Sequence, residues 1–156
     1  MNIVFVIGRI ALVLIFMISG GQKLMDINAT AADIAAKVTI PGALSGLAAQ
    51  ISSATGMTIP QLLAIGTGVI EVAAALMIAA NISTRVGAFL LIIFTLVATF
   101  YFHDFWNMAG AARTDNLAHA LKNLSIIGAL LVMFVLGPWR PTRAVDNTFE
   151  PGQTRY

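Results

Sequence analysis

Four stretches without Asp, Glu, Lys or Arg constrain this chain more than any other feature. They cover residues 10–22, 72–84, 86–103 and 123–139. Residues 38–70 are also free of charge, but their first half is rich in Gly, Ser and Thr and contains Pro41. A helix needs about 20 mostly apolar residues to cross roughly 30 Å of hydrocarbon. Extended over their neighbours, the stretches predict four spanning helices at about residues 3–24, 60–81, 86–102 and 118–136.

The composition agrees with a membrane protein. Hydrophobic residues make up 58% of the 156 residues and charged residues only 10%, whereas a soluble domain carries roughly 25% charged residues. The spans are continuous apolar runs rather than short segments of alternating polarity, which disfavours a transmembrane β-barrel. The apolar side chains therefore need the lipid bilayer as their solvent.

The connections between the spans differ in character. The first, residues 25–59, is the longest, and Leu44, Leu47 and Ile51 in it share one helical face. We expect short helices there, lying on the bundle or in the membrane interface. The predicted fold is therefore all-α: an integral membrane four-helix bundle over residues 1–139, with short interfacial helices in the first long loop and a polar tail over residues 140–156.

Four spans place both chain ends on one side of the membrane. Lys and Arg bias a loop toward the cytoplasm, but they are evenly divided between the two sides of this chain. Arg140 and Arg143 follow the last span directly, whereas Lys23 and Lys122 belong to the spans. This difference predicts that both termini are cytoplasmic.

Several classes of chemistry are disfavoured. The chain has no cysteine, which excludes disulfides and thiolate metal sites. A net charge of +2 without a basic run gives no reason to expect nucleic acid. The spacing of His103, Asp104 and His119 matches no metal-binding motif. We therefore predict no metal site and no covalently bound cofactor, and the sequence leaves enzymatic activity open.

Glu71 is the most informative residue, because it lies near the middle of the second predicted span. A charge at the bilayer centre is costly, and such a residue normally faces the bundle interior with a partner. Arg9 in the first span lies at a comparable depth, so we predict a buried Arg9–Glu71 ion pair. This pair either fixes helix register without doing chemistry or serves a proton relay or a ligand.

A second group of polar residues gathers at the opposite membrane face, where three spans end or begin. Lysine and imidazole supply hydrogen-bond donors, and aromatic residues around them supply walls for a quinone head group. The alternative is an aromatic belt with snorkelling lysines. The candidate quinone pocket consists of Lys23, His103, Asp104, Trp106, His119, Lys122 and Asn123.

The order and spacing of several motifs resemble the DoxX family of small bacterial membrane proteins. The resemblance covers residues 8–137. It rests on Arg9, the S-G-G-Q-K motif of residues 19–23, Glu71, the S-T-R-V-G-A motif of residues 83–88, the H-D-F-W motif of residues 103–106 and the K-N-L-S-I-I-G motif of residues 122–128.

This resemblance implies a four-helix protein of the bacterial inner membrane. It also implies association with thiosulfate- or quinol-linked oxidoreductases, as an accessory or anchor subunit that contacts partner subunits or a second copy of itself. Other members of the family are associated with oxidative-stress or metal-handling systems. A non-catalytic scaffold or assembly factor held by the buried ion pair is the alternative. A small transporter is a third class, which four spans without an internal repeat disfavour.

Overall fold

The structure is a computed structural model, and it describes residues 3–137. Four long helices carry most of the described chain: α1 (Ile3–Met25), α4 (Ile59–Ala79), α5 (Thr84–Phe102) and α6 (Gly110–Leu136). Two shorter helices, α2 (Ile27–Lys37) and α3 (Ser45–Thr55), fill the first connection together with the 3-10 turn η1 (Gly42–Leu44). A second 3-10 turn, η2 (Phe105–Asn107), connects α5 to α6. This described part contains no strand, and the predicted all-α fold is confirmed.

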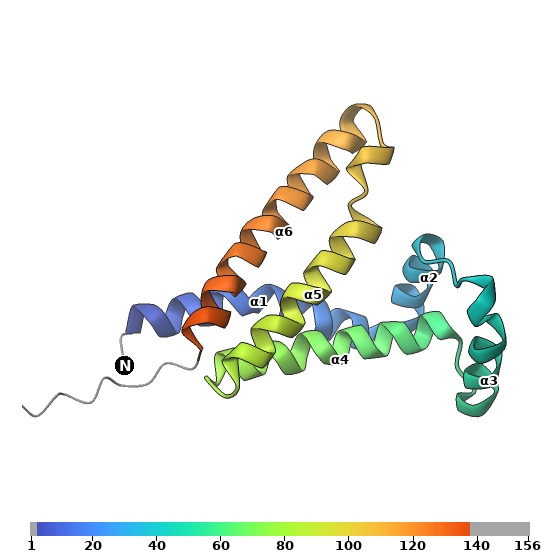
Figure 1. The fold of residues 1–156 in the computed structure, drawn as a ribbon, viewed down its shortest axis with the longest axis horizontal. Coiled ribbons are helices and arrows are strands. Elements are labelled where there is room, and N and C mark those ends of the chain that lie inside the picture. The colour runs from blue at the N-terminus through green and yellow to red at the C-terminus, as the bar shows by residue number, and fades with distance from the viewer. Residues whose placement is uncertain (1–2, 138–156) are drawn as a thin grey trace, which may run out of the picture.

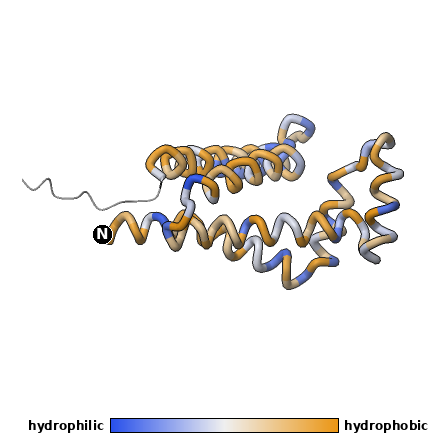
Figure 2. Tube along the Cα trace, turned by 60° about the horizontal axis from the view of Figure 1, so that its bottom comes forward, coloured by the Kyte–Doolittle hydropathy of each residue, from blue (hydrophilic) through white to orange (hydrophobic). Residues whose placement is uncertain are grey.

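All four long helices are long and apolar enough to cross a membrane. Figure 2 shows hydrophobic residues along their length, with hydrophilic positions concentrated where the chain turns. The chain is therefore a multi-pass membrane protein. The predicted spans match these helices, except that α6 begins at Gly110, eight residues before the expected start at residue 118. Polar residues 113–116 continue the helix rather than ending it, because polar side chains do not break a helix that extends beyond the hydrocarbon.

Local sequence signals explain where α4 and α5 begin. Thr58 is the N-cap of α4, and its side chain forms a capping box with Gln61, while Pro60 occupies the first turn. The α4–α5 connection is a tight turn in which Asn81 and Ser83 have positive φ angles of 61° and 51°. Because this turn is so short, α5 runs back beside α4.

The long helices form two antiparallel pairs, α1 with α4 and α5 with α6, and α4–α5 contacts join the pairs (Figure 1). The start of α1, the α4–α5 turn and the end of α6 all lie at one end of the molecule, which we call the terminal end (Figure 1). One core cluster draws on all four long helices. It contains Val13, Phe16, Ala74, Ala75, Ile78, Ala88, Leu91, Ile92, Ile127, Leu130 and Met133.

Glycines set the closest helix contacts. A Cβ atom on Gly20 of α1 would lie 2.8 Å from the carbonyl oxygen of Gly68 in α4, and one on Gly87 of α5 would lie 2.7 Å from that of Ala74. Interfaces between membrane helices favour small residues for this reason, since they allow backbones to approach closely. The two contacts hold α1 and α5 against α4.

The first connection is helical, as predicted. Helix α2 packs on α4 and buries Ala31 and Ile34. Helix α3 has no buried residue, and the face that Leu44 of η1 shares with Leu47 and Ile51 of α3 is exposed, with Leu47 at 56%. The lipid interface remains the predicted location of α3.

Candidate functional site

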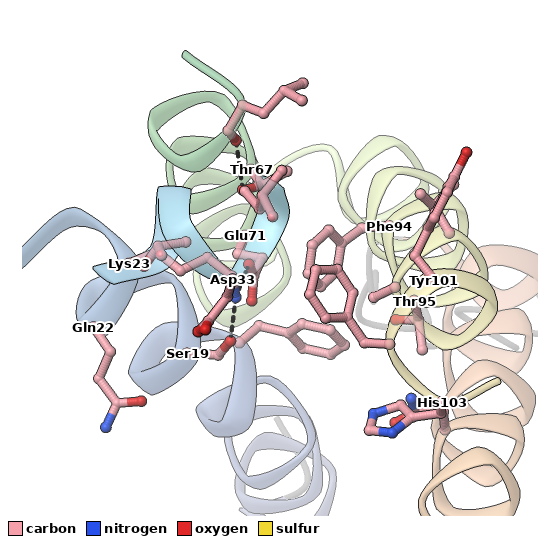
Figure 3. Close-up of a pocket in the computed structure, with 18 of the residues that line it drawn as sticks. Ser19, Gln22, Lys23, Asp33, Thr67, Glu71, Phe94, Thr95, Tyr101 and His103 are labelled. Carbon is pink, nitrogen blue, oxygen red and sulfur yellow. Dashed lines mark hydrogen bonds and ion pairs between the residues drawn. The ribbon is translucent and has the colours of Figure 1, made fainter. Parts of the chain in front are cut away.

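A cavity of about 680 Å³ lies between the α1–α4 pair and α5, with α2 along one side. Its volume is in the range of sites that hold small organic molecules, roughly 300–1,000 Å³. Apolar and aromatic side chains form most of the wall, including Phe16, Phe94, Tyr101 and Phe102. Polar groups come from five helices, so the cavity exists only in the folded bundle. Figure 3 shows its principal side chains.

Lys23 and Glu71 meet in the wall of this cavity. Lys23 Nζ lies 2.7 Å from Glu71 Oε1 and donates a hydrogen bond to Ser19 Oγ at 2.6 Å (Figure 3). The same ammonium lies 5.3 Å from the centroid of the Phe94 ring, within the range of a cation–π contact. One lysine on α1 therefore contacts α4 and α5 together.

Glu71 has remaining capacity to bind. Its side chain is 0% exposed, and Oε2 has no hydrogen-bond donor among residues 3–137. A carboxylate has about four lone-pair sites, and one ammonium does not satisfy them all. Glu71 lies at the cavity wall, but Lys23, at 24% exposed, is the member of the pair that a ligand there would meet.

The predicted Arg9–Glu71 pair is wrong, because Lys23 is the partner of Glu71. The reason is helix register. Gly20 lies against Gly68 and Glu71 where α1 packs on α4. Lys23 is within one turn of this contact, whereas Arg9 is eleven residues, or about 16 Å, away along α1. Arg9 is nevertheless buried, at 4% exposed, and lies over the Phe5 ring at 5.7 Å.

The α5–α6 side of the cavity contributes a chain of hydrogen bonds. Asn123 Nδ2 donates to Thr99 Oγ1 at 2.8 Å, and Thr99 Oγ1 donates to the carbonyl of Thr95 at 2.6 Å. Thr95 and Asn123 line the cavity. His103, at the end of α5, also lines it, and its Nδ1 lies 3.2 Å from Asn116 Oδ1. The structure therefore brings Lys23, His103 and Asn123 of the predicted pocket together.

The other predicted pocket residues do not line the cavity. His119 stacks on His103 with ring centroids 5.0 Å apart. Asp104 lies 3.7 Å from Lys37 Nζ, an ion pair between the end of α2 and the α5–η2 junction. Trp106 is half exposed and packs against Phe100 and Phe105. Lys122 lies on α6 about one turn beyond His119 but is absent from the cavity wall.

Sequence reasoning missed several lining residues. Ser19, Thr67 and Asp33 face the cavity from α1, α4 and α2. Ser19 is four residues before Lys23, and Thr67 is four residues before Glu71. Residues four apart share a helical face, so this spacing could have placed Ser19 beside Lys23 and Thr67 beside Glu71. Nothing in the sequence indicated that α2 would fold back to contribute Asp33.

Comparison with known proteins assigns the family. The DoxX family model matches residues 4–104, well over half of the chain. The chain belongs to the DoxX family. The match ends at the α5–η2 junction, so it includes α1, α4 and α5 with the Lys23–Glu71 pair.

A curated relative extends the similarity. Inner membrane protein YphA of Escherichia coli (strain K12) is 35% identical over 136 residues, which is 87% of this chain and 84% of the relative. No solved structure matches the chain at a significant level. The DoxX resemblance seen in the sequence motifs is thus confirmed.

Proposed function

We propose that this DoxX protein binds a lipophilic small molecule in the cavity between α1–α4 and α5, as an accessory or anchor subunit of a quinone-linked redox assembly. We place it in the bacterial inner membrane with both termini in the cytoplasm. Four apolar helices and the similarity to an inner membrane protein support this location. Partner subunits or a second copy would contact its lipid-facing helices.

The observation that carries the proposal is a cavity between helices able to span a membrane, with polar groups at a few positions of an apolar wall. Lys23 offers hydrogen-bond donors, and the imidazole of His103 adds a second polar group to the wall. Phe94, Tyr101 and Phe102 offer surfaces for a planar ring. A quinone head group has carbonyl acceptors and an apolar tail, which suits such donors beside lipid.

Two matched pairs of variants test this proposal. Lys23→Met and His103→Gln alter the cavity wall, whereas Lys122→Met and His119→Gln alter neighbouring positions that do not line it. Each protein is purified in mild detergent, and the extracted lipophilic molecules are identified and counted per chain. We expect both cavity variants to retain at least about tenfold less quinone than wild type, since a hydrogen bond to a charged group contributes about 1.5–3 kcal/mol.

The control variants should retain quinone at the wild-type level. If wild-type protein retains none, or if control and cavity variants lose it equally, the quinone proposal fails. The scaffold alternative predicts that outcome, with partner proteins still recovered in a pull-down from the same detergent. Flux of a solute into vesicles that depends on Glu71 would instead favour the transporter alternative.

A further inference from the structure

Arg9 is a buried cation without a counter-ion in the described structure. Its side chain is 4% exposed, and neither Nε nor Nη1 has a hydrogen-bond partner. No ion pair joins Arg9 to any of residues 3–137. Its guanidinium lies over the face of the Phe5 ring, 5.7 Å from the ring centroid. Buried polar groups are nearly always hydrogen-bonded, and a buried arginine has five donors to satisfy.

The position of Arg9 along α1 restricts which groups can reach its guanidinium. Arg9 lies six residues after the start of α1, about 9 Å along the helix. It is therefore close to the terminal end, at the depth where an arginine reaches the head-group layer. The acidic side chain nearest along the bundle is Glu71, which Lys23 already contacts.

Charge is distributed unevenly between the two ends of the described bundle. The other acidic residues from 3 to 137 belong to α2, to its junction with α1, to the junction after α5 or to the start of α6, all away from the terminal end. They are Asp26, Asp33, Asp104 and Asp115. The terminal end carries Arg9 and Arg85 instead.

Arg85 is already engaged. Its Nη2 donates to the carbonyl of Val135 at 3.4 Å, where a cation is favourable at the C-terminus of α6. Arg85 is also exposed, whereas Nε and Nη1 of Arg9 are buried without a partner. Guanidinium groups match the two oxygens of a phosphate better than any other side chain.

We propose that Arg9 binds the phosphate of an anionic phospholipid at the terminal end of the bundle. This site is separate from the cavity and does not depend on the function proposed for it. The C-terminal tail also contains carboxylates, at Asp146 and Glu150, but Arg140, Arg143 and Arg155 accompany them in the same segment. The tail is therefore net positive in sequence, and an external anion is the better partner.

Lipid binding to the full chain in detergent tests the proposal. Phosphatidylglycerol is titrated against phosphatidylcholine and inorganic phosphate, and bound lipid is counted by native mass spectrometry. Wild type should prefer phosphatidylglycerol, and Arg9→Met should weaken that binding at least about tenfold. Arg113→Met removes an exposed arginine near the other end of α6 and should leave the binding unchanged.

Further variants keep the result decisive. Arg9→Lys retains the charge but loses the two-pronged contact, so it should bind phosphatidylglycerol more weakly than wild type even if Arg9→Met fails to fold. Equal binding of both lipids by wild type would overturn the proposal, as would unchanged binding in Arg9→Lys and Arg9→Met. The Asp146→Asn/Glu150→Gln variant should bind like wild type. If it instead binds several-fold more lipid and loses stability, the tail is the partner of Arg9.

Discussion

Gly20 and Gly68 lie against each other where α1 crosses α4, so close that a Cβ atom on Gly20 would lie 2.8 Å from the carbonyl oxygen of Gly68. The same Cβ would lie 2.9 Å from Glu71 Cβ. This contact sets the register of the two helices. It also brings Lys23, one turn further along α1, to the carboxylate of Glu71.

The first prediction concerns this contact. Gly20→Ala should destabilise the protein by about 1–3 kcal/mol, because the added methyl group meets backbone that cannot move aside cheaply. Thermal unfolding in detergent measures the change. Gly21→Ala is the matched control, since a Cβ there meets nothing within 4 Å. Equal stability of the two variants would contradict the close packing of α1 on α4.

The second prediction concerns the ion pair. Lys23→Met and Glu71→Gln should each cost about 3–5 kcal/mol if the remaining charge stays buried, with the lysine variant more severe because Glu71 is fully enclosed. The double variant should cost less than the sum of the two. A double-mutant cycle from thermal unfolding in detergent gives the coupling.

The matching cycle between Arg9 and Glu71 is the control for that experiment. These two side chains form no ion pair, so the effects of Arg9→Met and Glu71→Gln should add within about 0.5 kcal/mol. Coupling between Arg9 and Glu71 as large as that between Lys23 and Glu71 would show that the helix register differs from the one described.

The third prediction concerns the α4–α5 interface. Gly87→Ala should lower the thermal unfolding midpoint, because its Cβ would lie 2.7 Å from the carbonyl oxygen of Ala74. Gly128→Ala in α6 has open space around it and should leave the midpoint unchanged or raise it slightly, since alanine favours a helix more than glycine does. A larger loss at Gly128 than at Gly87 is incompatible with this packing.

The fourth prediction is topological. Both termini should lie in the cytoplasm, and the absence of native cysteine makes the test clean. Single cysteines at Ser45 and Ala111 should react with a membrane-impermeant thiol reagent in intact cells. Cysteines at Ser83 and Thr148 should react only after the cells are opened. The reverse pattern would invert the orientation.

Hydropathy by itself determined the fold class and the four spans. Whether a segment prefers lipid depends on its own side chains, so runs such as residues 86–103 are readable without knowing their neighbours. The helical first connection was also predictable, because the face formed by Leu44, Leu47 and Ile51 is a local pattern. The early start of α6 at Gly110 was not predictable in this way. Polar residues indicate where a helix leaves the membrane, and they do not indicate where the helix itself begins.

The site depended on tertiary structure. Depth along a span predicted Arg9 as the partner of Glu71, but an ion pair also requires the right helix faces and register. Those were decided by the Gly20–Gly68 contact, which selects Lys23. In the same way, His103 and Asn123 reach the cavity while His119 and Lys122 do not. The sequence identified which residues are polar within an apolar protein. Only the packing of α1, α4, α5 and α6 decided which of these residues meet. Contacts between helices depend on the rotation of each helix about its axis and on the angle at which two helices cross, and no single helix encodes either.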